Sequence, residues 1–462
     1  MKDTGMKNGY YPVMVMNGDN PVFGYVNLSG GPATSVGTAA GTGAGAYQAT
    51  NAAPQRAEFN AIDGTEVYTE YLVKQLASDQ MAMAVDSDGR YLHATVFNYA
   101  GESMSLYYDR YNELSPGRSG DCWGGDVAYT DYTGRKAYQS GNNAIGLDSV
   151  NYDSLLLGRY QYPKLIMKGN SKTGVAYVYM SYYDDNLGEI LFRNFQIGKN
   201  VTGTRLSSSG TDSSGTTYAQ KYNFTENTYN SDTWNSGRLT VTSSGSKYFA
   251  MGVTSDNHVV IGYYDESLSK IVLKYSTNSI IGANPTADVA WTTSTASFPE
   301  YVGSYLSLAV DGNSVHLAAF DSYDSNLTYM YMPSYSGTEL TSVTVDQSSS
   351  VGQWTQIKVK QNVPYISYYN STETGSRDAI KIAYSNNPAS TSMVGGVDVI
   401  PGSSSGSGYT TGAWEYMTVP AITPPQGGDT KFQSVCLDFD TNDIPVVGYL
   451  GTNLEFGKWL DE

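Results

Sequence analysis

The stretch from Val260 to Ser276 reads VIGYYDESLSKIVLKYS. It consists of two apolar, strand-like segments joined by the polar residues Asp265-Glu266-Ser267, a pattern that predicts a β-hairpin. Segments similar to the first of these two, Val260–Asp265, recur along the chain. They end at Asn27, Asn98, Asp184, Asp265, Asp321, Asn370 and Gly451. A single hairpin says little about a fold, but a hairpin repeated through the whole chain decides it.

The repeated segment has a small residue near its middle in every copy. These residues are Gly24, Thr95, Ser181, Gly262, Ala318, Ser367 and Gly448. A further apolar run and a turn precede each copy, and a third strand-like run follows most of them, as in EILFRNF and KIVLKYS. A small side chain in the middle of a strand predicts that a neighbouring sheet approaches closely there.

Seven small antiparallel sheets in one chain can bury both of their faces by packing radially around an axis. The sequence therefore predicts an all-β fold, a single seven-bladed β-propeller of three- or four-stranded antiparallel blades that spans residues 1–462. The approximate blades are 9–70, 71–155, 156–244, 245–299, 300–350, 351–430 and 431–462. Residues 1–9 are too few for a comfortable closing strand. Long insertions at 28–60, 113–155, 199–244 and 388–430 are expected to extend from a face of the ring.

Segments such as VHLAAFDSYDSNLTYMY resemble the blades of bacterial exported or cell-surface β-propellers with Tyr-Tyr-Asp-type repeats. The resemblance covers nearly the whole chain. It implies a propeller fold and an extracellular, cell-surface or periplasmic setting, but no reaction. Sialidase-like propellers are a more distant resemblance, because their S-x-D-x-G-x-x-W box is absent from this chain.

The composition of the chain argues against nucleic acid as a partner. The formal net charge is -17, and no Lys/Arg-rich run offsets it, so nucleic acid is not an expected partner. Charged residues make up 15% of the chain against roughly 25% in ordinary globular proteins, while 49 Gly and 41 Tyr are present. Such a surface relies on hydroxyl and amide groups, as in many exported β-proteins.

Neither a membrane span nor a signal peptide is expected. No run of 18 apolar residues occurs, and the first residues, MKDTGMKNGYY, lack an apolar signal core. The two cysteines, Cys122 and Cys436, fall in unrelated segments, so we expect free thiols, with Cys436 buried.

Aromatic residues recur at one position near the start of the first strand of each unit. They are Tyr11, Tyr162, Tyr248, Tyr305, Trp354 and Phe432, with Gln80 in the remaining unit. The loops that begin at Asp184, Asp265, Asp321 and Asn370 are expected at the same face. Because aromatic rings stack on sugars and Asp or Asn side chains bind hydroxyls, these residues are the predicted ligand-binding site.

An architectural interpretation of the same residues stays open. A feature repeated in every blade can serve packing, with the aromatic rings wedged between blades and the Asp and Asn side chains capping the following turns. The carboxylates Asp184, Asp185, Asp265, Asp321 and Asp324 could alternatively hold Ca²⁺, although no EF-hand pattern is present. No other cofactor or metal is expected.

Catalytic signatures are absent from the sequence. There are three histidines, no zinc-type Cys/His cluster, no G-x-S-x-G elbow and no P-loop. We therefore expect a non-catalytic module that binds a glycan or a surface protein, which could belong to a surface assembly or act in adhesion. The alternative function is a polysaccharide-active hydrolase or lyase, which would require two carboxylates or an arginine trio in one pocket.

Overall fold

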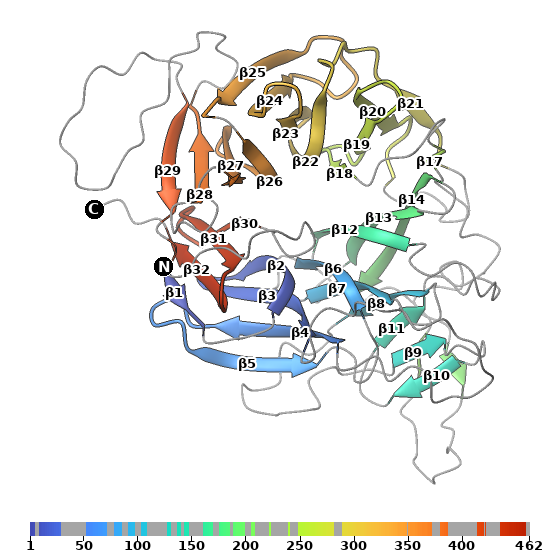
Figure 1. The fold of residues 1–462 in the computed structure, drawn as a ribbon. Helices are drawn as coiled ribbons and strands as arrows, with labels where there is room; N and C mark the ends of the chain where they lie inside the picture. The colour runs from blue at the N-terminus through green and yellow to red at the C-terminus, as the bar shows by residue number, and fades with distance from the viewer. Residues whose placement is uncertain are drawn as a thin grey trace, which may run out of the picture.

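The computed structural model describes the parts of the chain that form the sheets (Figure 1). These parts are residues 1–4, 9–28, 52–71, 78–85, 91–97, 103–108, 127–130, 136–139, 143–146, 160–169, 175–184, 188–198, 205–207, 221–222, 239–240, 248–280, 289–348, 350–371, 379–386, 414–419, 421 and 435–458. Their regular structure is entirely β-strand, with no α-helix, so the all-β prediction is confirmed for them. No helix among these residues is long and apolar enough to cross a membrane.

Five sheets are regular four-stranded antiparallel meanders, each made from one chain segment. The first contains β2 (Gly9–Asn17), β3 (Asn20–Leu28), β4 (Ala52–Phe59) and β5 (Glu66–Tyr71). The second contains β12 (Tyr160–Gly169), β13 (Val175–Asp184), β14 (Glu189–Gly198) and β17 (Leu239–Thr240). The third contains β18 (Phe249–Val253), β19 (Val259–Asp265), β20 (Lys270–Ser276) and β21 (Trp291–Thr293). The fourth contains β22 (Val302–Asp311), β23 (Ser314–Asp321), β24 (Asn326–Met332) and β25 (Thr341–Asp346). The fifth contains β26 (Val351–Lys360), β27 (Val363–Asn370), β28 (Ile380–Tyr384) and β29 (Glu415–Val419).

The remaining described strands depart from this regular form. One six-stranded sheet combines β6 (Ser78–Val85), β7 (Tyr91–Phe97) and β8 (Ser103–Tyr108) with β9 (Val127–Thr130), β10 (Lys136–Gln139) and β11 (Asn143–Gly146). Another sheet contains β30 (Val435–Phe439), β31 (Pro445–Leu450) and β32 (Leu454–Lys458), and its fourth strand is β1 (Lys2–Asp3). The strands β15 (Arg205–Ser207) and β16 (Lys221–Tyr222) form a separate pair.

The prediction of a seven-bladed propeller therefore needs correction, because only five of the described sheets are four-stranded blades made from one chain segment. The repeat in the sequence marks the first three strands of a sheet, and the outer strands come from segments that do not resemble one another. A local sequence pattern cannot show that a strand from the opposite end of the chain completes a sheet. The blade boundaries given above stay a prediction.

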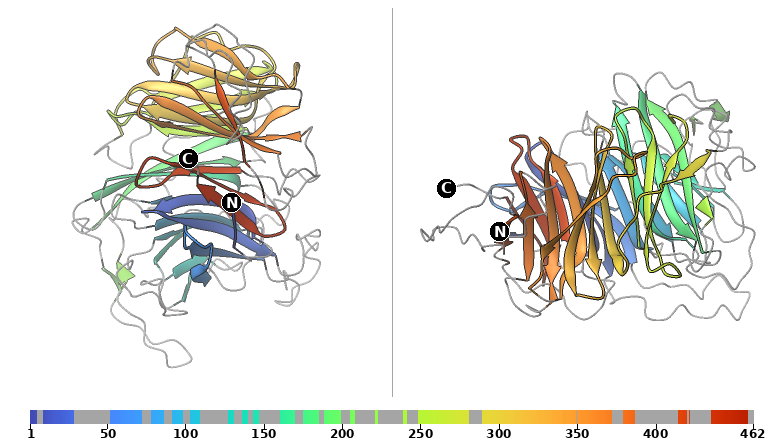
Figure 2. Two further views of the ribbon diagram at one scale, coloured as in Figure 1. Left: turned by 90° about the vertical axis from the view of Figure 1, so that its left-hand side faces the viewer. Right: turned by 90° about the horizontal axis from the view of Figure 1, so that it is seen from above.

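The sheets stand side by side in a propeller-like ring. The first strands of neighbouring sheets contact one another in the order β2, β6, β12, β18, β22, β26, β30 and again β2. Figure 1 shows these strands around the middle of the molecule, with strands such as β5, β25 and β29 outside, and Figure 2 shows the sheets stacked face against face. The apolar clusters accordingly lie between adjacent sheets, as where Leu273 of β20 packs with Leu317 of β23. Radial packing thus buries both faces of each sheet.

The first and last strands of the chain complete the ring. Lys2 and Asp3 pair with Phe456 and Glu455 in antiparallel register, and the Thr4 amide donates to the Leu454 carbonyl at 3.1 Å. The expectation that the first residues are too short to close the ring is therefore wrong. Two paired residues suffice because β32 already packs in the apolar cluster that contains Phe456 and Phe23.

The small residue of the second strand faces the next sheet, as its sequence predicts. A side chain at Gly262 would lie 3.3 Å from Leu317 and 3.5 Å from Leu306, both in the neighbouring sheet. At Gly448, a Cβ would come within 2.6 Å of the Phe23 ring. The buried Cys436 also reaches across a sheet boundary, since its thiol donates to the Pro12 carbonyl at 3.2 Å. Cys122 lies outside the described residues.

At Gly352 an added methyl group would meet the backbone of the neighbouring sheet. Its φ is +97°, and a Cβ would lie 2.8 Å from the Leu327 Cα, which is backbone and cannot rotate away. We expect Gly352→Ala to lower the free energy of unfolding by at least about 2 kcal/mol. Gly312→Ala is the matched control, because Gly312 has φ +60° with nothing within 4 Å and should cost only about 1 kcal/mol. Chemical denaturation measures both, and equal losses would contradict the close approach.

Ring closure by β1 can be tested in the same way. A variant that lacks residues 2–4 loses the backbone hydrogen bonds to β32 and should lose more than about 1 kcal/mol of unfolding free energy. The control replaces Lys2 and Asp3 with alanine, which keeps the strand and should cost less than the deletion. Unchanged thermal unfolding of the deletion variant would show that β1 does not hold the ring.

Candidate functional site

Three of the predicted aromatic positions, Tyr162, Tyr305 and Trp354, lie in β-bulges of first strands. One extra residue is inserted between Gln161 and Lys164 in β12, and the same irregularity surrounds Tyr305 in β22 and Trp354 in β26. At each bulge the aromatic residue has a left-handed backbone, with φ of 55° at Tyr162, 53° at Tyr305 and 56° at Trp354. Bulky residues rarely adopt this conformation, and such residues are concentrated at functional sites. A bulge also re-aims the side chain that it carries.

The rings of Tyr305 and Trp354 contact one another, and Tyr305 also contacts Tyr248, which directly precedes β18. The ring centroids of Tyr248 and Tyr305 are 5.1 Å apart, and those of Tyr305 and Trp354 are 4.7 Å apart. Burial, and then the nearby Tyr305 and Tyr162, raise the pKa of Tyr248, so its phenol stays neutral. We call Tyr162, Tyr248, Tyr305 and Trp354 the aromatic arc. All four are partly exposed, which distinguishes them from fully buried core rings such as Tyr329.

One cation accompanies the aromatic arc. Lys164 follows Tyr162 by two residues in β12, and its ammonium lies 5.6 Å from the centroid of Phe249, the residue after Tyr248. Burial lowers the pKa of Lys164 to about 8. No pattern in the sequence singles out this lysine, because only the folded chain places it near the Phe249 ring of the next sheet.

The predicted carboxylates are built into turns. Asp265 is 2% exposed, and its Oδ1 accepts hydrogen bonds from the amides of Ser267 and Leu268 at 3.0 and 3.1 Å. Asp321 Oδ1 does the same for the amides of Tyr323 and Asp324 at 2.9 and 3.1 Å. These are Asx turns, the architectural role that the sequence had left open.

The other predicted site residues are distributed differently. Asn370 is 2% exposed at the end of β27, and Asp184 ends β13 in register with Tyr160. The side chains of Tyr11, Gln80 and Asp184, like the whole of Phe432 and Asp185, lie outside what the structure describes. Among the described side chains, no group of three acidic, His or Cys residues could hold a metal ion.

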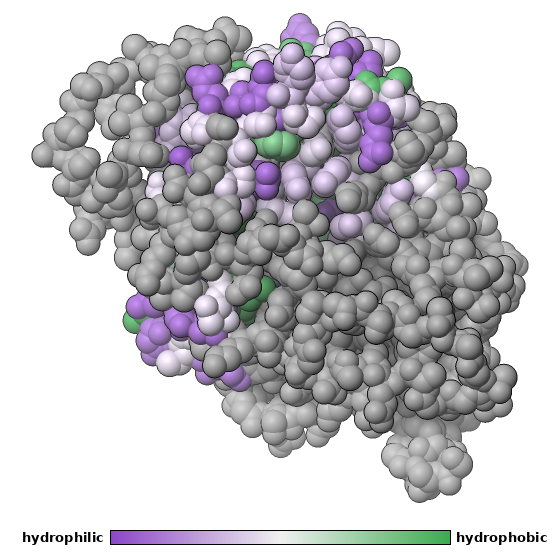
Figure 3. Space-filling view, in the orientation of Figure 1, coloured by the Kyte–Doolittle hydropathy of each residue, from purple (hydrophilic) through white to green (hydrophobic). Residues whose placement is uncertain are grey.

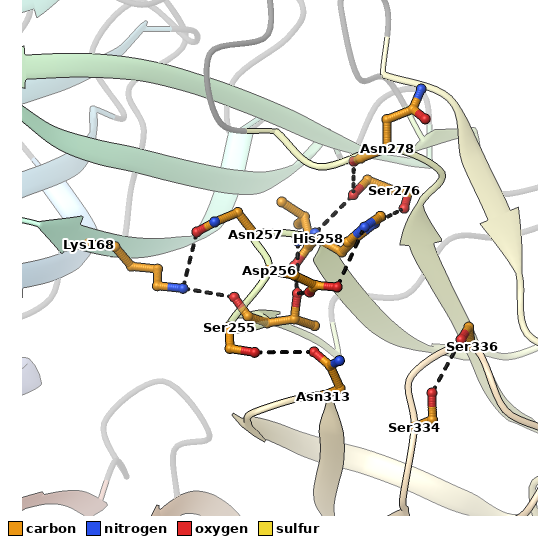
Figure 4. Close-up of polar contacts among 12 residues, drawn as sticks. Lys168, Ser255, Asp256, Asn257, His258, Ser276, Asn278, Asn313, Ser334 and Ser336 are labelled. Carbon is orange, nitrogen blue, oxygen red and sulfur yellow. Dashed lines mark hydrogen bonds and ion pairs between the residues drawn. The ribbon is translucent and has the colours of Figure 1, made fainter.

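Sequence reasoning missed a polar cluster at the turn between β18 and β19, at the opposite end of the first strands (Figure 4). Lys168 reaches over from β12, and its ammonium donates to the Thr254 carbonyl at 2.8 Å and to Asn257 Oδ1 at 3.2 Å. Within the turn, the His258 amide donates to the Thr254 hydroxyl at 2.8 Å. The His258 ring is also hydrogen-bonded to the Ser276 carbonyl at 2.7 Å. The hydrogen bonds of this cluster join its own members, and those from Lys168 connect the sheet of β12 to the sheet of β18.

A second histidine is structural as well. His316 is 3% exposed, with Nδ1 2.7 Å from the Tyr329 hydroxyl and Nε2 3.1 Å from the Ser314 hydroxyl. Burial lowers the pKa of His316 to about 4. The ring is therefore neutral at physiological pH.

Comparison with known proteins gives distant likenesses only. No family model matches the chain, and no curated protein sequence matches it. Similar solved structures include the lectin BP39L from Burkholderia pseudomallei, with 7% identity, TM-score 0.40 and 98% of each chain covered. The polysaccharide lyase Uly1 has 11% identity and TM-score 0.41, with 97% of this chain and 90% of that chain covered.

The Hadza microbial sialidase Hz136 has 10% identity and TM-score 0.39, with 98% of this chain covered. This chain spans only 66% of the length of that sialidase and 63% of the length of the phage phi92 endosialidase. Because the identities and TM-scores are this low, no function is carried over from these proteins. What the chain does has to be argued from its own residues.

The pH dependence of stability tests the environment of His316. Because its pKa is lowered from 6.5 to about 4, the unfolded chain binds a proton between these pH values that the folded protein does not. Folding stability supported by neutral His316 is therefore present above pH 6.5 and lost as the pH falls toward 4. Between pH 6.5 and 4, the melting temperature of His316→Asn should therefore fall less than that of the wild type. Equal dependence of the melting temperature on pH in both proteins would contradict the burial effect. Between about pH 7 and 8, the two proteins should show the same dependence.

Proposed function

We propose that this chain is a non-catalytic glycan-binding propeller whose aromatic arc contacts the sugar. The observation that carries the proposal is the continuous contact of Tyr248, Tyr305 and Trp354, which come from three neighbouring sheets. Backbone bulges hold Tyr305 and Trp354 in an uncommon conformation, and both rings stay partly exposed. A packing role alone would be served equally well by fully buried rings.

The chemistry of the arc suits a sugar. Aromatic faces stack on the apolar faces of sugar rings, and phenol and indole groups offer hydrogen bonds at the edges. Because Tyr305 packs against both Tyr248 and Trp354, the rings are restricted before binding, and less side-chain entropy is lost when a ligand binds. Binding of this kind needs no activated nucleophile or acid–base pair. Asp265 and Asp321 support the arc by ordering the turns at the same end of the sheets.

The setting of such a module follows from its ligand. A propeller that binds glycans would act where polysaccharides are exposed, which is at the cell surface, outside the cell or in the periplasm. A chain with few charges and many tyrosine, serine and threonine residues suits that setting.

Removal of single rings tests the proposal. We expect Tyr305→Ala and Trp354→Ala each to weaken binding to immobilised oligosaccharides by more than about 1 kcal/mol, or roughly fivefold, because aromatic anchors dominate the energy of such sites. The control is Tyr365→Ala, since Tyr365 stacks on Tyr384 near the opposite end of its sheet and should not change binding.

Two results would count against the proposed function. Folded Tyr305→Ala and Trp354→Ala variants that bind like the wild type would show that the arc is only packing. A wild-type protein that binds no member of an array of neutral and acidic oligosaccharides would show that the ligand is not a glycan. Thermal unfolding of each variant separates loss of binding from loss of fold.

A further inference from the structure

A stacked pair of exposed tyrosines lies beside the aromatic arc. Tyr301 is 45% exposed and Tyr323 is 77% exposed, and their ring centroids are 5.6 Å apart with 29° between the planes. Tyr301 immediately precedes β22, and Tyr323 lies in the turn between β23 and β24. We call this pair the outer platform. Large aromatic surface left in water at two contacting residues marks an interaction site more often than chance exposure.

The backbone of Tyr301 is held rigidly by its neighbours. Its amide donates to the Ser269 carbonyl of the preceding sheet at 2.6 Å, and its carbonyl accepts from the Ser322 amide at 2.9 Å. The Ser322 hydroxyl donates to the same carbonyl at 3.0 Å. These contacts fix a left-handed conformation with φ of 65°. The backbone that carries the Tyr301 ring is therefore ordered before any ligand arrives, which reduces the entropy lost on binding.

The next sheet shows that this backbone arrangement does not require tyrosine. Ser350 has the equivalent place before β26, with φ of 52°, and its carbonyl accepts from the Ser371 amide and hydroxyl, both at 2.9 Å. The same local geometry thus carries serine in one sheet and an exposed tyrosine in the other. The tyrosine side chain at 301 is consequently not explained by the turn.

The same reasoning holds for Tyr323. In the Asx turn at Asp321, Tyr323 contributes its amide, and in the equivalent turn at Asp265, Ser267 donates both its amide and its hydroxyl to Asp265 Oδ1, at 3.0 and 2.6 Å. Serine therefore fulfils the architectural requirement at least as well as tyrosine. Two tyrosines that these turns do not require are thus stacked on each other and exposed.

The platform and the arc lie at the same end of the sheet that contains β22. Tyr301 and Tyr305 are four residues apart at the start of β22, which at the strand rise is at most about 13 Å. Both lie at the end of the sheet where β22 pairs with the Asp321 end of β23. One extended ligand can therefore contact the rings of both sites.

The charges around the platform select against anionic ligands. Glu300 and Asp324 are exposed next to Tyr301 and Tyr323, and Asp321 begins the same turn. Lys270 pairs with Glu300 through a backbone bridge and brings one ammonium to this region. Three carboxylates against one ammonium repel a carboxylate or sulfate on a sugar, while an uncharged sugar face stacks on tyrosine without that penalty.

We infer that the outer platform is a second sugar-stacking subsite, which extends the arc and binds an uncharged residue farther along an oligosaccharide chain. The inference rests on the proposed glycan-binding function. It specifies the ligand as a neutral chain of several sugar units rather than a single sugar or an acidic glycan.

The test compares ligand length. Wild-type protein, the double variant Tyr301→Ser/Tyr323→Ser and the control Leu268→Ser are titrated with a linear neutral series from disaccharide to octasaccharide, taken from the family of glycans that the wild type binds on the array. Serine is the residue that equivalent turns carry, so the double variant should fold. Leu268 is 50% exposed in the neighbouring turn and has no place in the stacked pair.

The double variant should bind the longest members about tenfold more weakly than wild type and the disaccharide equally well, while Leu268→Ser should match wild type throughout. Wild-type affinity of the double variant for long members would overturn the inference, as would a wild type that prefers acidic oligosaccharides. Neither result would affect the arc. Failure of the proposed function appears instead as unchanged binding in Tyr305→Ala and Trp354→Ala, or as no glycan binding at all.

Discussion

The close approach of neighbouring sheets at their inner edges is the constraint on which the rest of the structure depends. Each first strand has to pass its neighbours around a narrow axis, and a flat strand would collide with the sheet beside it. Glycines permit the closest approaches, as at Gly352 over Leu327 and at Gly303, where a Cβ would lie 2.3 Å from the Tyr264 ring. Bulges supply the additional local twist. The ring is thus held by contacts between sheets, and the apolar clusters lie between them.

The candidate site is a consequence of this geometry. The bulge in a first strand also re-aims the side chain that it carries. In three first strands that side chain is Tyr162, Tyr305 or Trp354. Because the strands lie side by side around the axis, aromatic residues that are about 50 positions apart in the chain, such as Tyr305 and Trp354, come within ring contact. An architectural repeat and a binding surface can therefore occupy the same residues.

Irregularities within the repeat carry more functional information than the repeat itself. Asp265 and Asp321 recur because each turn needs a hydrogen-bond acceptor, so the turn alone accounts for their recurrence. Tyr301 differs, since the equivalent Ser350 supports the same turn without an exposed ring. The sequence displays this contrast, but the two positions can be recognised as equivalent only when their hydrogen bonds are known.

The sequence by itself determined the all-β class, the repeated strand pair and the position of the aromatic residues, because alternating apolar residues, turn residues and small residues are local features. It also placed the small residue against a neighbouring sheet, as Gly262 shows. Only the tertiary structure decided that β1 completes the sheet of β32, that the aromatic rings touch, and that Lys164 lies on Phe249. These contacts join residues far apart in the chain, and they depend on how the sheets pack. No local pattern in a single sequence contains that information.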